Sequence, residues 1–328
     1  MSLDRVSGAM TNAVFFVTFR NRRMLLRVYG VGCDQILDRA NELRWLSRLS
    51  QLGLGPRLLG TFDNGRFEEY LDSTTLTHAD LRDPELSCSI ASRLCQLHTT
   101  VIKAYPAPST VALQIWKNVG RWSEAIGQFQ ETDHSWVSRF QALDLTLLRK
   151  EITTCKAILN TLSSPIVFAH NDVRLSNLNK QKVKTSLLLN LFQTQYGNIL
   201  KLKTTGELVV IDFEYAGYNP RGYDIANHFC EWMYDYHADE PASMHPDRFP
   251  TVIEQRRFLQ AYLDATQDNE TTVDALLKET SAWIMASHLY WGLWGLIQAN
   301  QSEIDFDYFS YSVQRLTAFR ASLAQWIP

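Results

Sequence analysis

Short apolar runs alternate with polar turns near the start of the chain, a pattern typical of β-strands. Residues 13–19 and 24–29 are rich in Val, Leu and Phe and flank a polar segment at 20–23, which predicts a β-hairpin. The next stretch, 34–52, instead repeats apolar positions at helical spacing, and Gly53 is expected to end that helix. The chain therefore begins with strands that surround one helix.

Two further strands are predicted at 58–62 and 66–71, around an Asn64-Gly65 turn. After residue 76 the pattern becomes mostly helical. We therefore expect an α+β, protein-kinase-like two-lobed fold, with a small β-rich N-lobe over 1–72 and a larger C-lobe over 73–328. In the C-lobe, helices are predicted at 84–98, 110–128, 143–162, 220–237, 251–267, 271–298 and 306–326, and strands within 165–172 and 198–212.

Two strands of the C-lobe end in carboxylates. The apolar run 165–169 leads to His170-Asn171-Asp172, and 209–211 leads to Asp212. Two such carboxylates with an Asn nearby suit phosphoryl transfer, in which one Asp accepts a hydroxyl proton while the other Asp and an Asn hold Mg²⁺ on the nucleotide phosphates. Asp and Asn also cap strands and turns, and for either piece alone that alternative is favoured. The two pieces in this order favour a kinase-like site.

Composition narrows the classes of function. The 328 residues carry a net charge of −3, which gives no indication of nucleic acid binding. Five widely spaced cysteines without a CxxC pair argue against a disulfide framework or a zinc site. The chain opens without the apolar segment of a signal peptide, and its longest apolar stretch, 283–297, is too short to span a bilayer comfortably. We expect a cytoplasmic protein without stable membrane insertion.

Seven short motifs follow one another along the chain. They are SGAMTNAV (7–14), LRVYG (26–30), GRFEEY (65–70), HND (170–172), IDFEY (211–215), RGYDIANHFCEW (221–232) and WGLW (291–294). In this order the chain resembles the choline/ethanolamine kinase family over nearly its whole length. The resemblance is closer to choline kinases, and it implies ATP and Mg²⁺ as cofactors.

The resemblance implies a nucleotide site in the N-lobe. Small residues over 7–12 would turn over the ATP phosphates, because they let backbone N–H groups approach an anion closely. Arg27 would point a cation at the phosphates and Glu42 would hold it, with a simple surface pair as the alternative. Residues 68–71 would form the hinge between the lobes and face adenine with backbone groups. The expected cofactor-binding residues are Ser7, Gly8, Thr11, Asn12, Arg27, Glu42 and Glu69.

The resemblance also implies the catalytic groups: Asp172 as base, and Asp212 and Asn198 as ligands of Mg²⁺. In the family motif the metal-binding Asn lies five residues after the base. Asn177 has that spacing in the chain as written. We prefer Asn198, because removing the 21 residues from 173 to 193 restores the family motif and because a strand follows Asn198.

The segment 173–193 resembles nothing in the family. Val codons begin with GT, Gln193 can be encoded by CAG and the length keeps the reading frame, so our hypothesis is a translated, unspliced intron. A genuine insertion loop is the alternative. If present, the segment must loop out for Asp172 and Asn198 to converge, since misplacing catalytic groups by about 1 Å can cost roughly 10²-fold in rate. The chain also begins close to its first motif, which a shortened chain or gene model would explain.

An aromatic pocket is the expected choline site. A quaternary ammonium has no hydrogen to donate, so aromatic faces and a nearby carboxylate bind it. Trp291 and Trp294 lie three residues apart and share a helix face, although a Trp pair in isolation usually belongs to a buried helix. Ethanolamine, with three N–H donors, would prefer more acceptors and fewer rings. The substrate-binding residues implied by the resemblance are Tyr215, Glu231, Tyr236, Trp291, Trp294, Phe306 and Tyr311.

These observations predict ATP-dependent phosphorylation of choline to phosphocholine, the first step of the CDP-choline route to phosphatidylcholine. The alternatives are an ethanolamine kinase, a kinase of aminoglycoside-phosphotransferase type, and a catalytically impaired choline-binding homologue. A protein kinase is disfavoured because its His-Arg-Asp and Asp-Phe-Gly motifs are absent. A homodimer is implied by the family alone.

Overall fold

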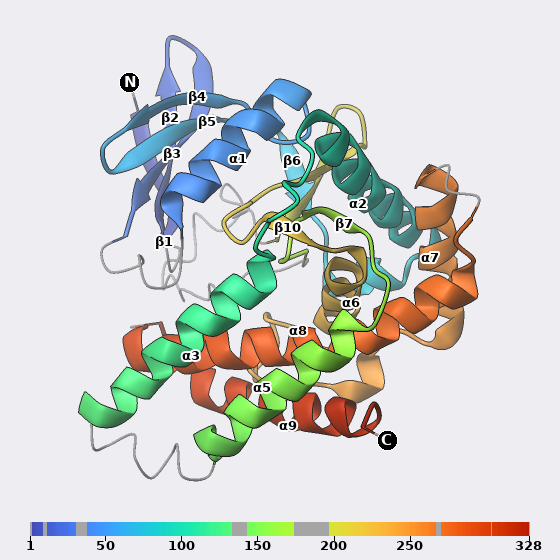
Figure 1. Ribbon diagram of the computed structural model, residues 1–328. Helices are drawn as coiled ribbons and strands as arrows, with labels where there is room; N and C mark the ends of the chain where they lie inside the picture. The colour runs from blue at the N-terminus through green and yellow to red at the C-terminus, as the bar shows by residue number, and fades with distance from the viewer. Residues whose placement is uncertain are drawn as a thin grey trace.

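A small sheet-rich N-terminal part lies beside a larger, mostly helical C-terminal part in the computed structural model (Figure 1). The α+β, two-lobed arrangement predicted from the sequence is therefore confirmed. The structure describes residues 2–8, 12–30, 38–132, 143–173, 197–266, 270–302 and 304–327.

Antiparallel strands build the N-lobe sheet, in the order β1-β2-β3-β5-β4. Val14, Phe16 and Leu25 are buried on one face of the sheet, and Tyr70 packs against them. The strand β1 was not predicted, because its sequence SLDRVSG shows little β-branched or aromatic character. The strands are β1 (Ser2–Gly8), β2 (Asn12–Phe19), β3 (Arg22–Tyr29), β4 (Leu58–Phe62) and β5 (Gly65–Glu69).

Helix α1 (Arg39–Leu52) connects the two lobes by packing. It begins at Asp38, whose side chain accepts the Asn41 N–H at 3.0 Å, and it ends at Gly53, whose φ of 67° is a left-handed conformation. The predicted start at residue 34 lies outside the described residues. Trp45, with other apolar side chains of α1, packs against Phe168 of the C-lobe. Helix α1 and this C-lobe residue therefore belong to one apolar cluster.

In the C-lobe, three polar residues lie close to the ends of short strands. β7 (Ile166–Ala169) pairs with β10 (Gly217–Pro220), and β8 (Ile199–Leu202) pairs with β6 (Ser73–Thr75) and β9 (Leu208–Val210). Asp172 follows β7, Asn198 directly precedes β8 and Asp212 follows β9.

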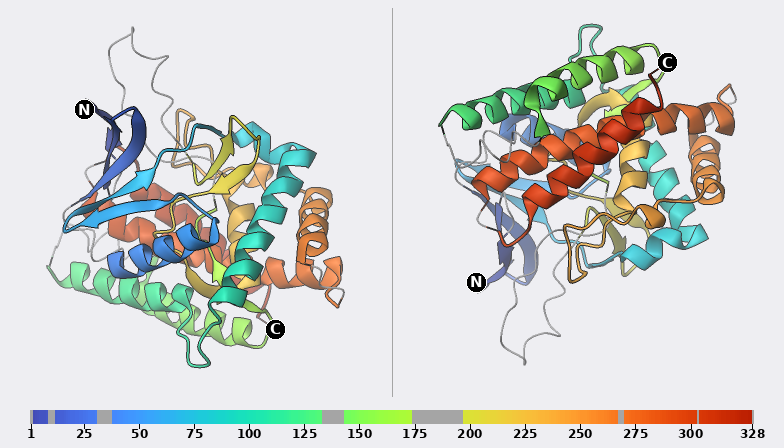
Figure 2. Two further views of the ribbon diagram at one scale, coloured as in Figure 1. Left: turned by 90° about the horizontal axis from the view of Figure 1, so that it is seen from above. Right: turned by 90° about the horizontal axis from the view of Figure 1, so that it is seen from below.

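Helices make up the rest of the C-lobe (Figure 2). Helix α8 is buried on nearly all sides, between α6, α3 and α9, as expected for a helix that is apolar all round. Among the described helices, none combines the length and apolar character needed to cross a membrane. The helices are α2 (Pro84–Ala104), α3 (Gln114–Thr132), α5 (Leu145–Asn160), α6 (Arg221–Glu231), α7 (Val252–Thr266), α8 (Val273–Gln301) and α9 (Tyr308–Ala324), with short 3₁₀ turns η2 (His78–Arg82) and η4 (Pro246–Arg248).

Candidate active site

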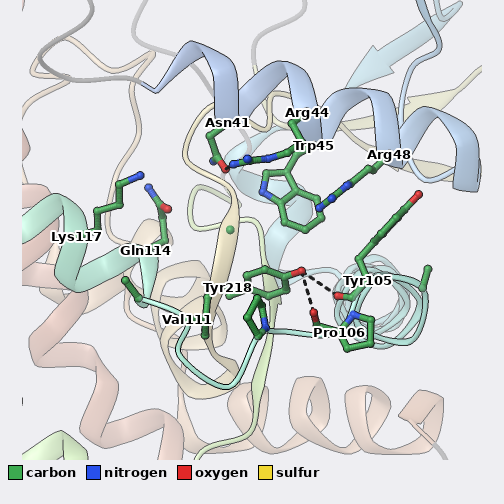
Figure 3. Close-up of a pocket in the computed structure, with 14 residues that line it drawn as sticks. Asn41, Arg44, Trp45, Arg48, Tyr105, Pro106, Val111, Gln114, Lys117 and Tyr218 are labelled. Carbon is green, nitrogen blue, oxygen red and sulfur yellow. Dashed lines mark hydrogen bonds between the residues drawn. The ribbon is translucent and has the colours of Figure 1, made fainter.

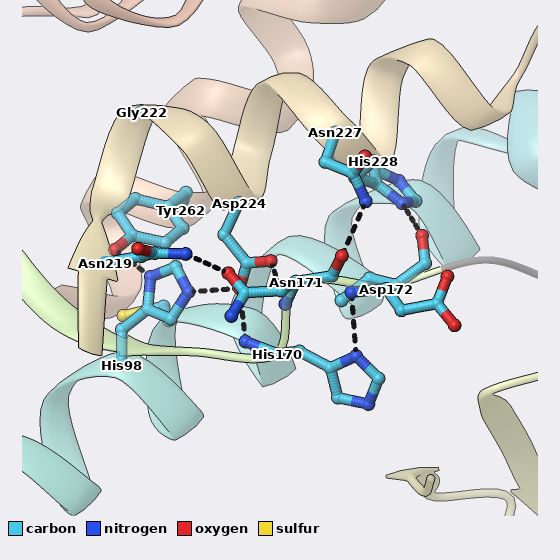
Figure 4. A network of polar contacts seen from close by, with 12 residues as sticks. His98, His170, Asn171, Asp172, Asn219, Gly222, Asp224, Asn227, His228 and Tyr262 are labelled. Carbon is cyan, nitrogen blue, oxygen red and sulfur yellow. Dashed lines mark hydrogen bonds and ion pairs between the residues drawn. The ribbon is translucent and has the colours of Figure 1, made fainter. Parts of the chain in front are cut away.

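The loop after β7 is fixed by a buried carboxylate. Asp224, on α6, accepts hydrogen bonds from the backbone N–H groups of His170 and Asn171 at 2.8 and 2.7 Å (Figure 4). Its carboxylate also contacts Nε2 of His98 at 2.9 Å. Burial alone would raise the pKa of Asp224, but its hydrogen bonds and electrostatic interactions with His98 and His170 together outweigh burial and lower it. The charged carboxylate of Asp224 thus holds this loop in place through its backbone N–H groups.

Asn171 gives this loop its sharp turn. Its φ of 68° lies in the left-handed region, which asparagine adopts more readily than most other non-glycine residues. The Asn171 side chain donates to the carbonyl of Tyr215 at 2.8 Å and accepts from Asn219 at 2.7 Å. Its own carbonyl accepts a hydrogen bond from the side chain of Asn227 at 3.2 Å. These bonds determine where the next residue, Asp172, is placed.

Asp172 and Asn198 lie side by side, although 26 positions separate them in the sequence. The Asn198 amide donates to the backbone carbonyl of Asp172 at 2.8 Å and to its carboxylate at 3.0 Å. The Asp172 N–H donates to Nδ1 of His170, whose Nε2 lies 2.9 Å from the Ile211 carbonyl. The rest of the inserted segment after Val173, with Asn177, lies outside the described residues.

Carboxylates gather where a cation could bind. Oxygens of Glu42, Asp212 and Glu214 all lie within 4.8 Å of one another. Burial raises the pKa of Glu214 to about 8, and the neighbouring charges of Asp212 and Glu42 add to this. Within the described residues, the buried Oδ1 atoms of Asp212 and Asn198 have no hydrogen-bond partner. Oxygen donors of this kind are the ligands that Mg²⁺ prefers, so these residues fit the expected ion.

The predicted contact between Arg27 and Glu42 is wrong. Arg27 pairs with Glu68 at 3.0 Å, whereas Glu42 pairs with Arg66 at 2.7 Å and with Arg39 at 2.8 Å. The reason is strand register: Arg27 on β3 lies directly opposite Arg66 on β5, and Arg66 takes the helix carboxylate. Burial acts to raise the pKa of Glu68, but the two arginines outweigh it and lower that pKa to about 2. Arg27 is therefore held as a buried cation by a strand glutamate.

The turn predicted over residues 7–12 is wrong for Ser7 and Gly8. Both belong to β1, where Gly8 pairs with Ala13. Asn12 begins β2, and Thr11 lies outside the described residues. The end of the first strand could not be predicted, because the segment has few glycines and because small polar residues occur both in the strand and in the turn that follows it.

Glu69 stands at the end of β5, just before the connection to the C-lobe. Its backbone N–H donates to the carbonyl of Arg57 at 2.9 Å, and its carboxylate contacts the Arg57 side chain at 3.3 Å. This N–H is therefore engaged within the sheet. In the connection that follows, the Leu71 carbonyl accepts from the Ser73 hydroxyl at 3.1 Å and the Asp72 carbonyl from the Lys203 N–H at 3.0 Å. The adenine contact expected for residues 68–71 stays a prediction.

The predicted aromatic residues come together around α8. Trp291 and Trp294 meet edge to face with ring centroids 5.2 Å apart, and Trp291 meets Tyr215 at 5.4 Å. The indole N–H of Trp294 donates to the Tyr215 hydroxyl at 2.9 Å, and the Trp294 ring also meets Tyr311 at 6.3 Å. These side chains are buried and pack directly on one another. A trimethylammonium group could therefore enter only if the rings move apart.

Glu231 lies at the edge of this cluster but already has two partners. Its carboxylate accepts from the Tyr236 hydroxyl at 2.9 Å and from Arg315 at 2.6 Å. The ring of Tyr236 lies 6.5 Å from that of Phe306, which completes the set. Arg315 was not predicted, yet it is fully buried. Its sequence signal was weak, because α9 contains a second arginine, Arg320, and nothing local distinguishes the buried one.

Comparison with known proteins agrees with this geometry. The family model of choline/ethanolamine kinases matches residues 3–320. Probable choline kinase 2 of Arabidopsis thaliana is 35% identical over 322 residues, which cover 96% of this chain and 83% of that protein. The choline/ethanolamine kinase of Homo sapiens is 32% identical over 332 residues, which cover 94% and 77%.

A solved structure extends the agreement to the fold. The Plasmodium vivax ethanolamine kinase superposes with a TM-score of 0.78 at 25% identity, over 98% of this chain and 84% of that one. The relatives thus carry the names of choline, ethanolamine and dual-substrate kinases. Since the family model spans almost the entire sequence and the fold agrees, the chain belongs to the choline/ethanolamine kinase family.

Proposed function

We propose that the chain transfers the γ-phosphoryl group of ATP to the hydroxyl of choline, which yields phosphocholine and ADP. The observation that carries this proposal is the direct connection between the aromatic cluster and the catalytic loop. Asn171 donates to the carbonyl of Tyr215, and Asn227 binds both the Asn171 carbonyl and the Trp291 indole. A substrate held among these rings would therefore have its hydroxyl near Asp172.

In the proposed mechanism Asp172 accepts the hydroxyl proton as the oxygen attacks the γ-phosphorus in line with the departing ADP. Asn198 orients the carboxylate of Asp172 through its 3.0 Å hydrogen bond. Its other side-chain atom, Oδ1, which has no partner among the described residues, and the carboxylates of Asp212 and Glu214 are the oxygens that we expect to hold Mg²⁺. Mg²⁺, when bound there, would neutralise charge on the phosphates. Arg27, held by Glu68, is with Arg66 one of two buried arginines in the described part of the N-lobe, and is the one that we assign to the phosphates.

The surroundings of the expected ammonium position favour choline over ethanolamine. Aromatic faces attract a quaternary ammonium without needing hydrogen-bond acceptors. Primary ammonium groups need acceptors for three N–H donors, and the carboxylate expected to face the ammonium, Glu231, already accepts from Tyr236 and Arg315. We therefore propose choline as the preferred substrate. We also propose that residues 1–72 form the nucleotide-binding N-lobe and that residues 73–328 form the C-lobe, which holds the catalytic loop and the choline site.

The test measures the formation of phosphorylated product in the presence of ATP and Mg²⁺. The values of kcat/KM for choline and for ethanolamine are then compared. Two proteins are assayed, the chain as written and the same chain without residues 173–193. Choline turnover by both would support the proposal and identify the segment as a tolerated loop. Turnover by the shortened chain alone would support the retained intron. Preference for ethanolamine, or no turnover of either alcohol by either protein, would contradict the proposal.

A further inference from the structure

A second pocket lies between α1 and the segment that joins α2 to α3, with β10 beside it (Figure 3). It encloses about 590 Å³, within the range of about 300–1,000 Å³ that small-molecule sites occupy. None of the residues that line it belongs to the catalytic loop, the metal position or the aromatic cluster. The pocket is formed jointly by the helix of the N-lobe and by elements of the C-lobe.

The lining of this pocket is basic. Arg44 and Arg48 lie four residues apart on α1, and Lys117 faces them from α3. Lys117 contacts Asp38 at 3.0 Å, but no acidic side chain is part of the lining. Across the described ranges, neither arginine forms an ion pair, and Arg44 donates only to the Asn41 side-chain oxygen, at 2.7 Å. Like charges at this spacing destabilise a helix, so a bound anion would relieve their repulsion.

Arg48 is already held in position to receive an anion. Its guanidinium carbon lies 4.8 Å from the ring centroid of Trp45 and 4.5 Å from that of Tyr105. A guanidinium that packs on rings keeps its N–H donors, which lie in its own plane, available for a pair of oxygens. The Tyr218 hydroxyl donates to the Tyr105 carbonyl at 2.9 Å and so fixes this wall. The cation needs little further ordering before it binds.

Half-buried rings provide a second kind of surface in the same pocket. Tyr105 and Tyr218 are both partly exposed, and Tyr218 meets the buried Trp45 edge to face at 5.3 Å. We propose that this pocket binds a small phosphate monoester with an aromatic body. Arg48 and Arg44 hold the phosphate oxygens with Lys117 facing them, and the body packs on Tyr105 and Tyr218. Such a ligand bridges α1 to the C-lobe.

The test uses phenyl phosphate as the probe in isothermal titration calorimetry. The full chain is first saturated with Mg²⁺, a non-hydrolysable ATP analogue and choline, so that the probe cannot report on the catalytic site. We expect saturable binding that Arg48→Ala and Arg44→Ala each weaken at least tenfold. Arg22→Ala, which removes an exposed arginine of β3, is the matched control and leaves binding unchanged.

A comparison on the unaltered protein makes the test independent of any variant. Phenol, which has the ring without the phosphate, must bind at least tenfold more weakly than phenyl phosphate. Equal binding of the two, equal binding in the arginine variants, or no saturable binding of phosphate monoesters overturns the proposal. Vesicles with phosphatidic acid test the other source of a phosphate monoester: retention on them that depends on Arg48, without binding of phenyl phosphate, also overturns the proposal, because the pocket would then bind a lipid headgroup that has no aromatic body.

Discussion

The indole N–H of Trp291 donates a 2.6 Å hydrogen bond to the side-chain oxygen of Asn227. The amide of the same asparagine donates to the carbonyl of Asn171, the residue before the proposed base. One side chain thus joins the aromatic cluster to the catalytic loop from within the core. A movement of Trp291 to admit a substrate would be transmitted to Asn171 through two hydrogen bonds.

Replacing Asn227 with Ala is expected to reduce stability and turnover together. The indole N–H of Trp291 and the hydroxyl of Ser287 would lose their acceptor, and each buried polar group left unsatisfied costs about 1–3 kcal/mol. The Asn171 carbonyl would lose its donor, so the loop would hold Asp172 less firmly. Denaturant unfolding should show the lower free energy of unfolding, and kcat should fall roughly 10-fold or more.

Ser287→Ala is the matched control, because it removes the 2.8 Å bond to Asn227 but leaves the connection from Trp291 to Asn171 intact. Its loss of stability should be the smaller one, with kcat close to that of the parent chain. If Ser287→Ala lowers kcat as much as Asn227→Ala does, the proposed coupling through Asn227 is wrong.

Glu231→Gln is expected to raise the KM for choline and to destabilise the fold. The change leaves Arg315 buried without its counter-charge, and breaking a buried ion pair from one side costs about 3–5 kcal/mol. Losing the charge attraction between this carboxylate and the quaternary ammonium would raise KM roughly 10-fold or more. Thermal unfolding and steady-state kinetics with choline measure the two effects.

A double variant separates the two roles of Glu231. Glu231→Gln with Arg315→Met removes the stranded cation, so most of the lost stability should return while KM stays high. Recovery of the parent KM in this double variant would mean that Glu231 only serves to neutralise Arg315. The proposed part of this carboxylate in substrate binding would then have to be abandoned.

Several site positions could be predicted because local sequence fixes them. Asp172 and Asp212 follow apolar strands, and both lie where the strands end. Asn198 directly precedes β8 and comes to lie against Asp172. Apolar runs and the polar residues that end them are local properties of the sequence, so they can be recognised without the fold. The helix end at Gly53 was predictable for the same reason, since glycine readily adopts positive φ.

Partners that depend on packing could not be predicted. Whether Glu42 meets Arg27 or Arg66 is decided by the register of β3 against β5, and both arginines lie on adjacent positions across these strands. Arg315 reaches Glu231 over 84 residues of sequence. No local pattern encodes such distances, so these ion pairs became visible only in the folded chain.

Removing the Asn198 amide should raise the Mg²⁺ concentration needed for half-maximal activity. Asn198→Ala deletes one proposed oxygen ligand and the hydrogen bonds to Asp172, so we expect a shift of at least roughly 10-fold together with a lower kcat. Asn177→Ala is the control, because Asn177 has the family spacing in the uninterrupted sequence. A larger Mg²⁺ shift in Asn177→Ala than in Asn198→Ala would reverse our assignment.

The stability of the fold should decrease in mild acid because of His228. This residue is buried, stacks on Phe258 at 5.0 Å, and lies with Nδ1 3.2 Å from the Val173 carbonyl. Burial lowers its pKa from 6.5 to about 4, although the Val173 carbonyl and Asp224 act in the opposite direction. In the unfolded chain the His228 imidazole is therefore protonated near pH 6.5, whereas in the folded chain it is protonated only near pH 4.

This difference sets the direction of the pH dependence. The contribution of His228 is fully present above pH 6.5 and is lost as pH falls towards 4, by roughly 3 kcal/mol in total if the shift is complete. Unfolding free energies between pH 7.5 and 5 should fall more steeply for the parent chain than for His228→Leu. His237→Asn, which alters an exposed histidine, should keep the parent slope. An unchanged slope in His228→Leu would show that His228 is not the group that takes up this proton, and that the acid sensitivity arises elsewhere in the core.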